Sequence, residues 1–226
     1  MLQTETAPAI PLWINGHAYL TMAPEFLDVC NPMSGQVLRR TPMCGFDEAG
    51  KAIKAARAAL GLWAKRAVVA RAGLLATVGD ALAGYGSHFA RLITEESGMG
   101  GDAAADEVSA VVALLRDSAA SNASGVFCIV GNTEEPMLGA LRLAVPALMA
   151  GAAVVVRPSP ETPSALFALA ELTGRCGFPG GVFNIMHGGE SAVHGLRSHA
   201  GVTVLFSCGD VGAAVSSAGS PVVNPG

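Results

Sequence analysis

The chain has 226 residues, of which 51% are hydrophobic and 14% charged, and its formal net charge at neutral pH is -4. This length and apolar content suit a single large domain, or one domain with an appendage, and they argue against disorder. Basic and aromatic residues are too sparse for a phosphate-binding surface or a stacking platform, which excludes nucleic acid as a partner. The first ten residues include Glu5 and no continuous apolar core, so no secretory signal or transit peptide is predicted, and we expect a cytoplasmic protein.

Cysteine and histidine spacing indicates neither a disulfide framework nor a metal site. The five cysteines form an odd set with no CxxC pair, so free thiols in a reducing compartment are expected. His187, His194 and His199 are separated by seven and five residues, which does not place them on one helical face in a known ligand pattern. We therefore predict no metal.

Residues 1–120 are predicted to form a short β appendage followed by a layer of helices. Turn signals at Asn15-Gly16 and Met33-Ser34-Gly35 separate short apolar stretches, a pattern typical of antiparallel strands. From Asp47, a candidate N-cap, apolar residues recur at helical spacing through several segments as far as Ala120. We expect this half to pack against the rest of the chain.

Residues 121–226 alternate between short apolar strands and helices, with a last helix expected after Asp210. The expected strands lie near residues 126–130, 154–156, 182–185 and 202–206. Glycine or proline stands at most boundaries, which favours a parallel sheet with right-handed crossover connections. The predicted fold class is therefore α/β, a Rossmann-like sheet with flanking helices that forms one compact unit with residues 1–120.

The twenty residues from Met137 to Val156 are apolar enough to suggest a membrane span by length alone. Arg142, Pro146 and Gly151 interrupt them, however, and divide them into a buried helix and a short β-branched strand. This unit delivers Arg157 to the carboxyl end of a central strand, which is where open α/β sheets bind ligands. No membrane span is therefore predicted.

Six segments, in order along the chain, carry the sequence patterns of a known enzyme family. They are Trp13-Ile14-Asn15-Gly16, Asn31-Pro32-Met33-Ser34-Gly35, Glu95 to Gly98, Asp106-Glu107-Val108, Pro146 to Ser159 and Gly177 to Asn184. Together with the helices around Trp63 and Arg71, they resemble the amino-terminal half of the aldehyde dehydrogenase superfamily. The match extends over nearly the whole chain, which makes it more specific than any single motif.

The resemblance implies an NAD or NADP site at the carboxyl edge of the sheet, without a metal. Arg157 stands where the family has a lysine on the ribose hydroxyls, and a salt bridge to an acid such as Glu161 is its alternative role. The residues expected to contact the cofactor are Val130, Gly131, Arg157, Ser159, Gly188, Gly189, Phe206, Ser207 and Gly209.

Three departures from the family pattern predict that dinucleotide binding is weakened or lost. Arg157 replaces the lysine but still donates hydrogen bonds and suits a phosphate. Pro160 replaces the acid that accepts from the ribose hydroxyls. The loop from Phe206 to Gly212 is one residue shorter than its counterpart in the family and brings Asp210 close to the expected anion.

Other departures affect the expected chemistry. Glu134 stands where the family has an asparagine that donates to a developing oxyanion, and an ionised carboxylate cannot donate. We interpret Glu134 and Glu135 instead as solvated caps of the following helix. Pro225 stands where the general base is expected, and the nucleophilic cysteine belongs to a catalytic domain beyond Gly226. No catalytic residue is therefore predicted, because no recognisable motif places a base beside Cys208.

Three hypotheses of function follow. The first is a catalytically incomplete member of the superfamily, a pseudoenzyme that serves as an accessory or structural subunit in a homo-oligomer or in a hetero-oligomer with a full-length dehydrogenase. The second is the cofactor-binding part of an NAD(P)-dependent aldehyde dehydrogenase whose catalytic half lies on another chain or was removed. The third is a nucleotide sensor without chemistry, in which tight binding changes the affinity for a partner.

Overall fold

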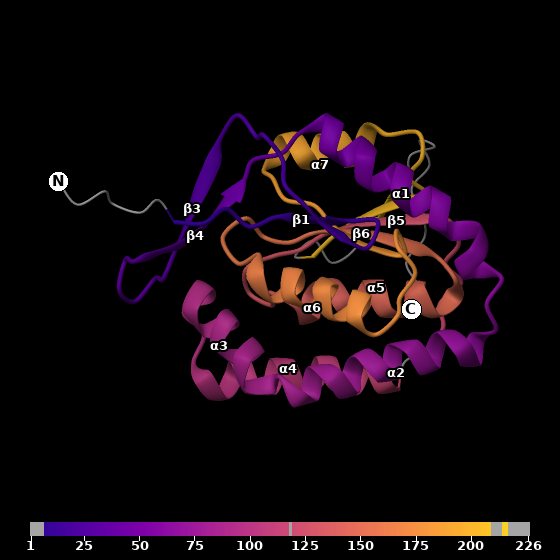
Figure 1. The fold of residues 1–226 in the computed structure, drawn as a ribbon, viewed down its shortest axis with the longest axis horizontal. Helices are drawn as coiled ribbons and strands as arrows, with labels where there is room; N and C mark the ends of the chain where they lie inside the picture. Colours follow the sequence, from indigo (N-terminus) through magenta and orange to yellow (C-terminus); the bar gives the residue numbers. More distant parts are fainter. Residues whose placement is uncertain (1–6, 118, 209–213, 217–226) are drawn as a thin grey trace.

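The computed structural model describes residues 7–117, 119–208 and the backbone of 214–216. A central sheet has two helices on each face, and a further layer of helices lies below the second face (Figure 1). The first face is covered by α1 (Phe46–Ala64) and α7 (Glu190–Ser198). The second face is covered by α5 (Leu138–Ala150) and α6 (Ser164–Arg175). The outer layer consists of α2 (Val68–Gly84), α3 (Gly86–Ser97) and α4 (Gly101–Arg116).

In the described part of the chain, seven strands form the central sheet in the order β2-β1-β7-β6-β5-β8-β9. The four middle strands run parallel, and crossover helices connect them. They are β7 (Phe183–Ile185), β6 (Ala153–Arg157), β5 (Val126–Val130) and β8 (Val204–Ser207). The Rossmann-like α/β fold class is thereby confirmed.

Both edges of the sheet differ from the prediction, because antiparallel strands complete them. The hairpin of β1 (Leu12–Ile14) and β2 (His17–Tyr19) pairs with β7, so it extends the main sheet instead of forming a separate appendage. At the other edge, β9 (Ala214–Ser216) pairs with β8 where the last helix was predicted. These strands form hydrogen bonds with backbone groups that an open sheet edge would leave exposed. The pairing depends on strands that are distant in sequence, and a segment of three residues is too short for its periodicity to predict it.

A separate hairpin of β3 (Phe26–Cys30) and β4 (Val37–Pro42) stands at one end of the molecule (Figure 1). Its turn is closed by the Asn31 side chain, whose Oδ1 accepts hydrogen bonds from the amides of Met33 at 2.9 Å and Ser34 at 3.2 Å. Gly35 follows with φ +69, a left-handed conformation that favours glycine. The predicted turn is confirmed.

The β-branched run of β6 is buried on both sides, as predicted for a central parallel strand. Val154 and Val156 face the cluster formed with α5 and α6, whereas Val155 faces the cluster formed with α1 and α7. Among the described residues, no single helix is both long and apolar enough to cross a membrane. Taken together, α2 and α3 are long and apolar enough, but the two helices are bent by 75° relative to each other.

Three buried charged side chains of the outer helical layer contact the ends of the sheet-covering helices. Glu107 Oε1 accepts hydrogen bonds from the amides of Met137 and Leu138, both at 2.9 Å, at the start of α5. Glu96 accepts from the amide of Ser164 at 3.0 Å, at the start of α6. Arg71 donates to the carbonyl of Met149 at 2.8 Å, at the end of α5. Negative groups at helix starts and a positive group at a helix end match the helix dipole.

We expect Glu107→Ala to lower the free energy of unfolding by about 2 kcal/mol, because it leaves one buried and one partly buried helix amide without an acceptor. Glu107→Gln should cost less, since its amide oxygen still accepts. Denaturant unfolding monitored by circular dichroism measures both values. The neighbouring exposed Asp106→Ala is the control and should stay within about 0.5 kcal/mol of wild type. Equal stability of E107A and D106A would contradict this role of Glu107.

Candidate functional site

The carboxyl ends of the four parallel strands meet at one edge of the sheet. The chain passes from β5 outward to β6 and β7 and then returns to β8 on the other side of β5. This reversal is the topological switch point at which open α/β sheets bind ligands. Val130 ends β5 and Ser207 ends β8 there, and the amide of Cys208 donates to the Val130 carbonyl at 2.8 Å. The predicted residues on these strands therefore do lie together.

The ends of β5 and β6 are joined through Gly131 and Ser159. The amide of Gly131 donates to the Arg157 carbonyl at 2.8 Å. A Cβ on Gly131 would lie 3.4 Å from the Cα of Pro158, an ordinary van der Waals contact, so the two strand ends are closely packed here. The Ser159 hydroxyl is buried and lies 2.9 Å from the Thr133 hydroxyl. Ser159 thus connects the loop after β6 to the loop after β5.

Arg157 reaches across the edge toward the loop that follows β7. Its Nε donates to the Gly188 carbonyl at 2.7 Å. Among the described residues, Arg157 forms no ion pair with Glu161 or with any other acid, so the salt bridge predicted as its alternative role is wrong. Burial lowers the pKa of the guanidinium below its ordinary value. A positive charge that water solvates poorly is a good partner for an anion.

Gly188 and Gly189 are among the residues expected to contact the cofactor, and in the structure they approach other parts of the protein closely. Gly188 has φ +138, and a Cβ there would lie 2.6 Å from the carbonyl oxygen of Cys44. Gly189 is the N-cap residue of α7, and its carbonyl accepts from the amide of Val193. These glycines let the loop pass against the segment before α1.

His187 lies in the loop between β7 and α7, and its side chain is fully buried next to this site. Its Nε2 lies 3.0 Å from the Pro11 carbonyl, which fixes the tautomer with the proton on Nε2. Its Nδ1 has no hydrogen-bond partner among the residues that the structure describes. Burial lowers the pKa of the imidazole to about 4, and the charge of Arg157 adds to that effect.

The loop after β8 is only partly described, since the predicted positions Gly209, Asp210 and Pro225 lie outside the described residues. Phe206 stacks on Phe127 with ring centroids 5.8 Å apart and packs against the core, so its ring is a packing element. Burial raises the pKa of the Cys208 thiol to about 11, with a smaller contribution from Glu135. This thiol is therefore not activated as a nucleophile.

The predicted capping role of Glu134 and Glu135 is wrong. Glu107 takes the first amides of α5, whereas Glu135 forms an ion pair with Arg142. The Asn132 side chain accepts from the Glu135 amide at 3.2 Å and so shapes the turn before the helix. Glu134 is exposed, which leaves a carboxylate at the position where the resemblance places an oxyanion donor.

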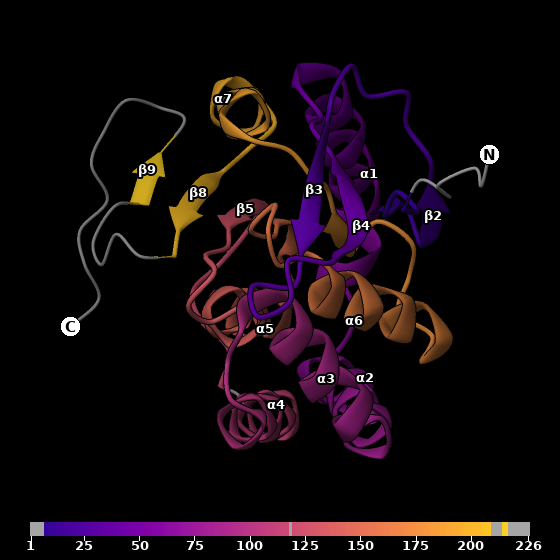
Figure 2. The same cartoon turned by 90° about the vertical axis from the view of Figure 1, so that its left-hand side faces the viewer.

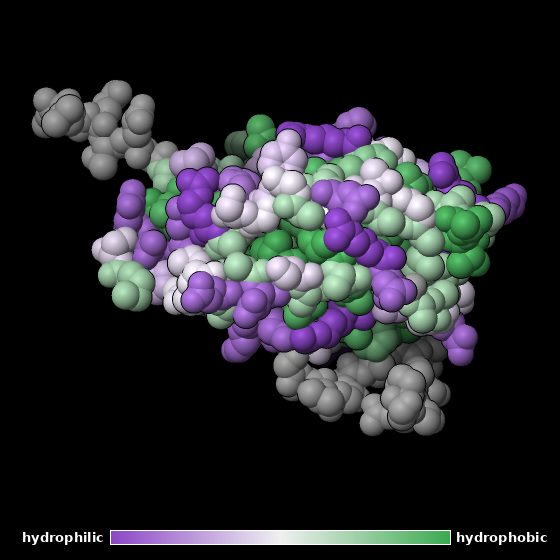
Figure 3. Space-filling view, turned by 90° about the horizontal axis from the view of Figure 1, so that it is seen from below, coloured by the Kyte–Doolittle hydropathy of each residue, from purple (hydrophilic) through white to green (hydrophobic). Residues whose placement is uncertain are grey.

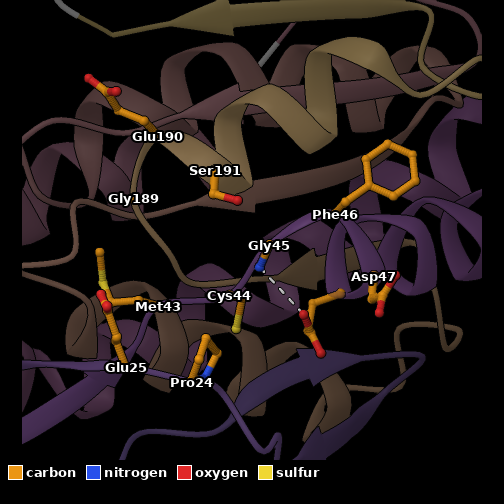
Figure 4. A pocket seen from close by; sticks show the side chains of 11 residues that line it. Pro24, Glu25, Met43, Cys44, Gly45, Phe46, Asp47, Gly189, Glu190 and Ser191 are labelled. Atoms are coloured by element: carbon orange, nitrogen blue, oxygen red, sulfur yellow. Dashed lines mark hydrogen bonds between the residues drawn. The ribbon is translucent and has the colours of Figure 1, made fainter.

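Sequence reasoning missed a cleft of about 600 Å³ beside this edge, between the loop before α1 and the start of α7 (Figure 4). The cleft is lined by the acidic residues Glu25, Asp47 and Glu190. These residues are far apart in the sequence, so no sequence motif indicates that they lie together. α1 begins at Phe46 with Gly45 as its N-cap residue, so Asp47 lies in the first turn instead of at the predicted N-cap position. The acidic lining makes the cleft unsuitable for phosphate groups.

A group of three or more His, Cys, Asp or Glu side chains arranged for a metal ion is not found among the described residues.

Comparison with known proteins identifies the family. The aldehyde dehydrogenase family model matches residues 19–124 and 119–222, and the chain therefore belongs to this family. A 3,6-anhydro-alpha-L-galactose dehydrogenase from Streptomyces coelicolor is 31% identical over 226 residues, covering 90% of this chain and 46% of that protein. A succinate-semialdehyde dehydrogenase of Escherichia coli, named with NADP(+), is 31% identical over 80% of this chain and 42% of its own length.

A solved structure of lactaldehyde dehydrogenase shares the fold, with a TM-score of 0.81 at 26% identity. The similarity covers 89% of this chain and 47% of that one. The chain thus spans slightly less than half the length of the relatives it matches.

We expect acid to destabilise the fold through His187. Its folded pKa of about 4 lies below the unfolded value of about 6.5, so between these pH values the unfolded chain binds a proton that folded His187 does not. The free energy of unfolding should fall as the pH decreases through this window, by about 2 kcal/mol at pH 5. Urea titrations at pH 7.5 and pH 5 measure the loss.

The Gln variant of His187 keeps a donor for the Pro11 carbonyl but does not titrate, so H187Q should lose less stability between the two pH values than wild type. His17, which is exposed, provides the control: H17Q should show the same pH dependence as wild type. If the free energy of unfolding decreased equally in wild type and H187Q between pH 7.5 and pH 5, His187 would not be the cause of the acid destabilisation.

Proposed function

We propose that this chain supplies the dinucleotide-binding part of an aldehyde dehydrogenase-family protein and that it binds NADP in preference to NAD. The observation that carries this proposal is the position of Arg157. It lies at the carboxyl end of a central parallel strand, is half-buried, and is fixed in direction by its hydrogen bond to Gly188. A guanidinium keeps its charge and presents several donors in one plane, which matches a phosphate.

The absence of a carboxylate at position 160 supports the same preference. In dinucleotide-binding folds an acidic residue accepts from the ribose 2′-hydroxyl of NAD, whereas an arginine accommodates the 2′-phosphate of NADP. Pro160 offers no side-chain acceptor, so ribose recognition loses a hydrogen bond while repulsion of a phosphate is avoided. The NADP(+) in the name of the Escherichia coli relative agrees with this choice.

We expect the affinity to be low, because groups of the site already serve the protein. The Ser159 hydroxyl is bonded to Thr133, and Arg157 Nε is bonded to Gly188. A ligand must replace these contacts or use the atoms that remain. When bound, NADP would supply the hydride acceptor, and this chain would hold it at the sheet edge.

We further propose that the chain oxidises no aldehyde by itself and acts as an accessory subunit. Cys208 is not activated, since burial raises the pKa of its thiol to about 11. Exposed Glu134 cannot donate to an oxyanion. Exposed apolar groups favour assembly, notably Met22 and Leu20 before β3, which are 99% and 76% exposed. On the outer helical layer, by contrast, apolar and hydrophilic side chains are interspersed (Figure 3).

Arg157→Ala should weaken NADP binding by about 10- to 100-fold, because the charge-assisted hydrogen bonds to the 2′-phosphate are lost. Binding of NAD, which has no such phosphate, should change much less. Isothermal titration calorimetry of wild type and R157A with each nucleotide measures the effect. The control is Arg175→Ala, which removes an exposed charge at the far end of α6 and should bind like wild type. No binding of either nucleotide at millimolar concentration, or tighter binding of NAD than of NADP, would refute the proposal.

The accessory role predicts association that depends on the apolar segment before β3. Sedimentation velocity at protein concentrations of about 1 to 100 µM, where weak interfaces form, should show a larger species for the chain alone or mixed with a full-length dehydrogenase of the family. The double variant L20S/M22S should reduce this species, whereas L62S, at the end of α1, should not. A monomer under all these conditions would exclude the role.

A further inference from the structure

The strand β4 contacts the middle of the loop that follows β6, and it also contacts the carboxylate that holds the end of this loop. Arg39 and Thr41 are two positions apart in β4, so their side chains project from the same face of the strand. Thr41 is fully buried, and its hydroxyl donates to the Pro160 carbonyl at 2.7 Å. Arg39 Nε lies 3.0 Å from Oε1 of Glu96, the carboxylate that holds the start of α6. In Figure 2 this hairpin lies in front of the sheet and above α6.

The loop of residues 158–163 is fixed from two other sides. At its start, the Arg157 carbonyl accepts from Gly131, and Ser159 is bonded to Thr133. At its end, the amide of Ser164 donates to Glu96. Between these points the internal hydrogen bonds are at or beyond the upper end of the usual range: the Thr162 amide lies 3.2 Å from the Ser159 carbonyl, and the Glu161 amide lies 3.4 Å from the Ser159 hydroxyl. The middle of the loop thus depends on the contact from β4.

Loss of the Thr41 hydroxyl would remove the hydrogen bond that holds the loop at Pro160. A carbonyl without its partner in a buried setting is costly, so the loop would move toward water. Such movement changes the path of the chain between Arg157 and α6 and makes the direction of the guanidinium less defined. Binding groups that are not held in place lose affinity because ordering them consumes part of the binding energy.

We propose that Thr41 is a positioning residue for the nucleotide-binding loop and that Arg39 restrains the same loop through Glu96. This inference rests on the proposed NADP site. The hairpin of β3 and β4 thereby becomes part of the cofactor site, although neither Arg39 nor Thr41 touches the ligand. The effect should be greater for NADP than for NAD, because Arg157 is assigned to the 2′-phosphate.

The test compares Thr41→Val, which keeps the shape but loses the hydroxyl, with Thr41→Ser, which keeps the hydroxyl. Thr77→Val is the matched control, since the Thr77 hydroxyl donates to the Gly73 carbonyl within α2. Hydrogen exchange without nucleotide reports the order of the loop. Calorimetry gives the dissociation constants for NADP and NAD.

For T41V we expect at least about fivefold faster exchange at Glu161 and Thr162 and a dissociation constant for NADP raised about 5- to 10-fold. T41S and T77V should resemble wild type. Unchanged exchange and affinity in T41V would overturn the proposal. So would an equal rise in exchange over the whole chain, or an equal loss of NADP and NAD affinity, since both would indicate general destabilisation.

A second pair of variants covers the case in which T41V does not fold. Arg39→Gln should also loosen residues 159–164, whereas Arg116→Gln, which breaks the exposed ion pair with Asp80, should not. If wild type binds neither nucleotide, the proposed function fails, and hydrogen exchange alone decides the role of Thr41. Faster exchange confined to the loop then supports the restraint, and unchanged exchange overturns it.

Discussion

The fold depends on charges that the outer helical layer places at the ends of the sheet-covering helices. Glu107 and Glu96 accept the first amides of α5 and α6, and Arg71 donates to a carbonyl at the end of α5. All three side chains are buried, so their hydrogen bonds are needed to offset the desolvation of charge. Burial raises the pKa of both carboxyls, while the helix amides oppose that rise.

These contacts also locate the candidate site, because α5 and α6 begin at the carboxyl edge of the sheet. Fixing the first turn of each helix fixes the loop that precedes it. Those loops carry Gly131 and Ser159, and the second begins directly after Arg157. The site is thus supported by residues distant in sequence that never face a ligand, an arrangement that preorganised sites require.

The electrostatics of the edge divide it into two regions. Arg157 gives one region a positive charge next to the ends of β5 and β6. Glu25, Asp47 and Glu190 make the neighbouring cleft negative. For the dinucleotide proposed above, the charge of Arg157 suits its phosphates, whereas the carboxylates of the cleft beside α1 would repel them.

Local periodicity and glycine or proline boundaries were enough to predict the four parallel strands and the helices between them, the burial of Val154 to Val156, and the position of Arg157 at a strand end, although not the antiparallel strand β9. Three features are seen only in the folded molecule: β1 pairs with β7, Gly188 approaches Cys44, and Glu107 instead of Glu135 caps α5. Each of these features joins segments that are far apart in the chain. Buried polar groups need hydrogen-bond partners, and the packing of the core decides which partners are within reach.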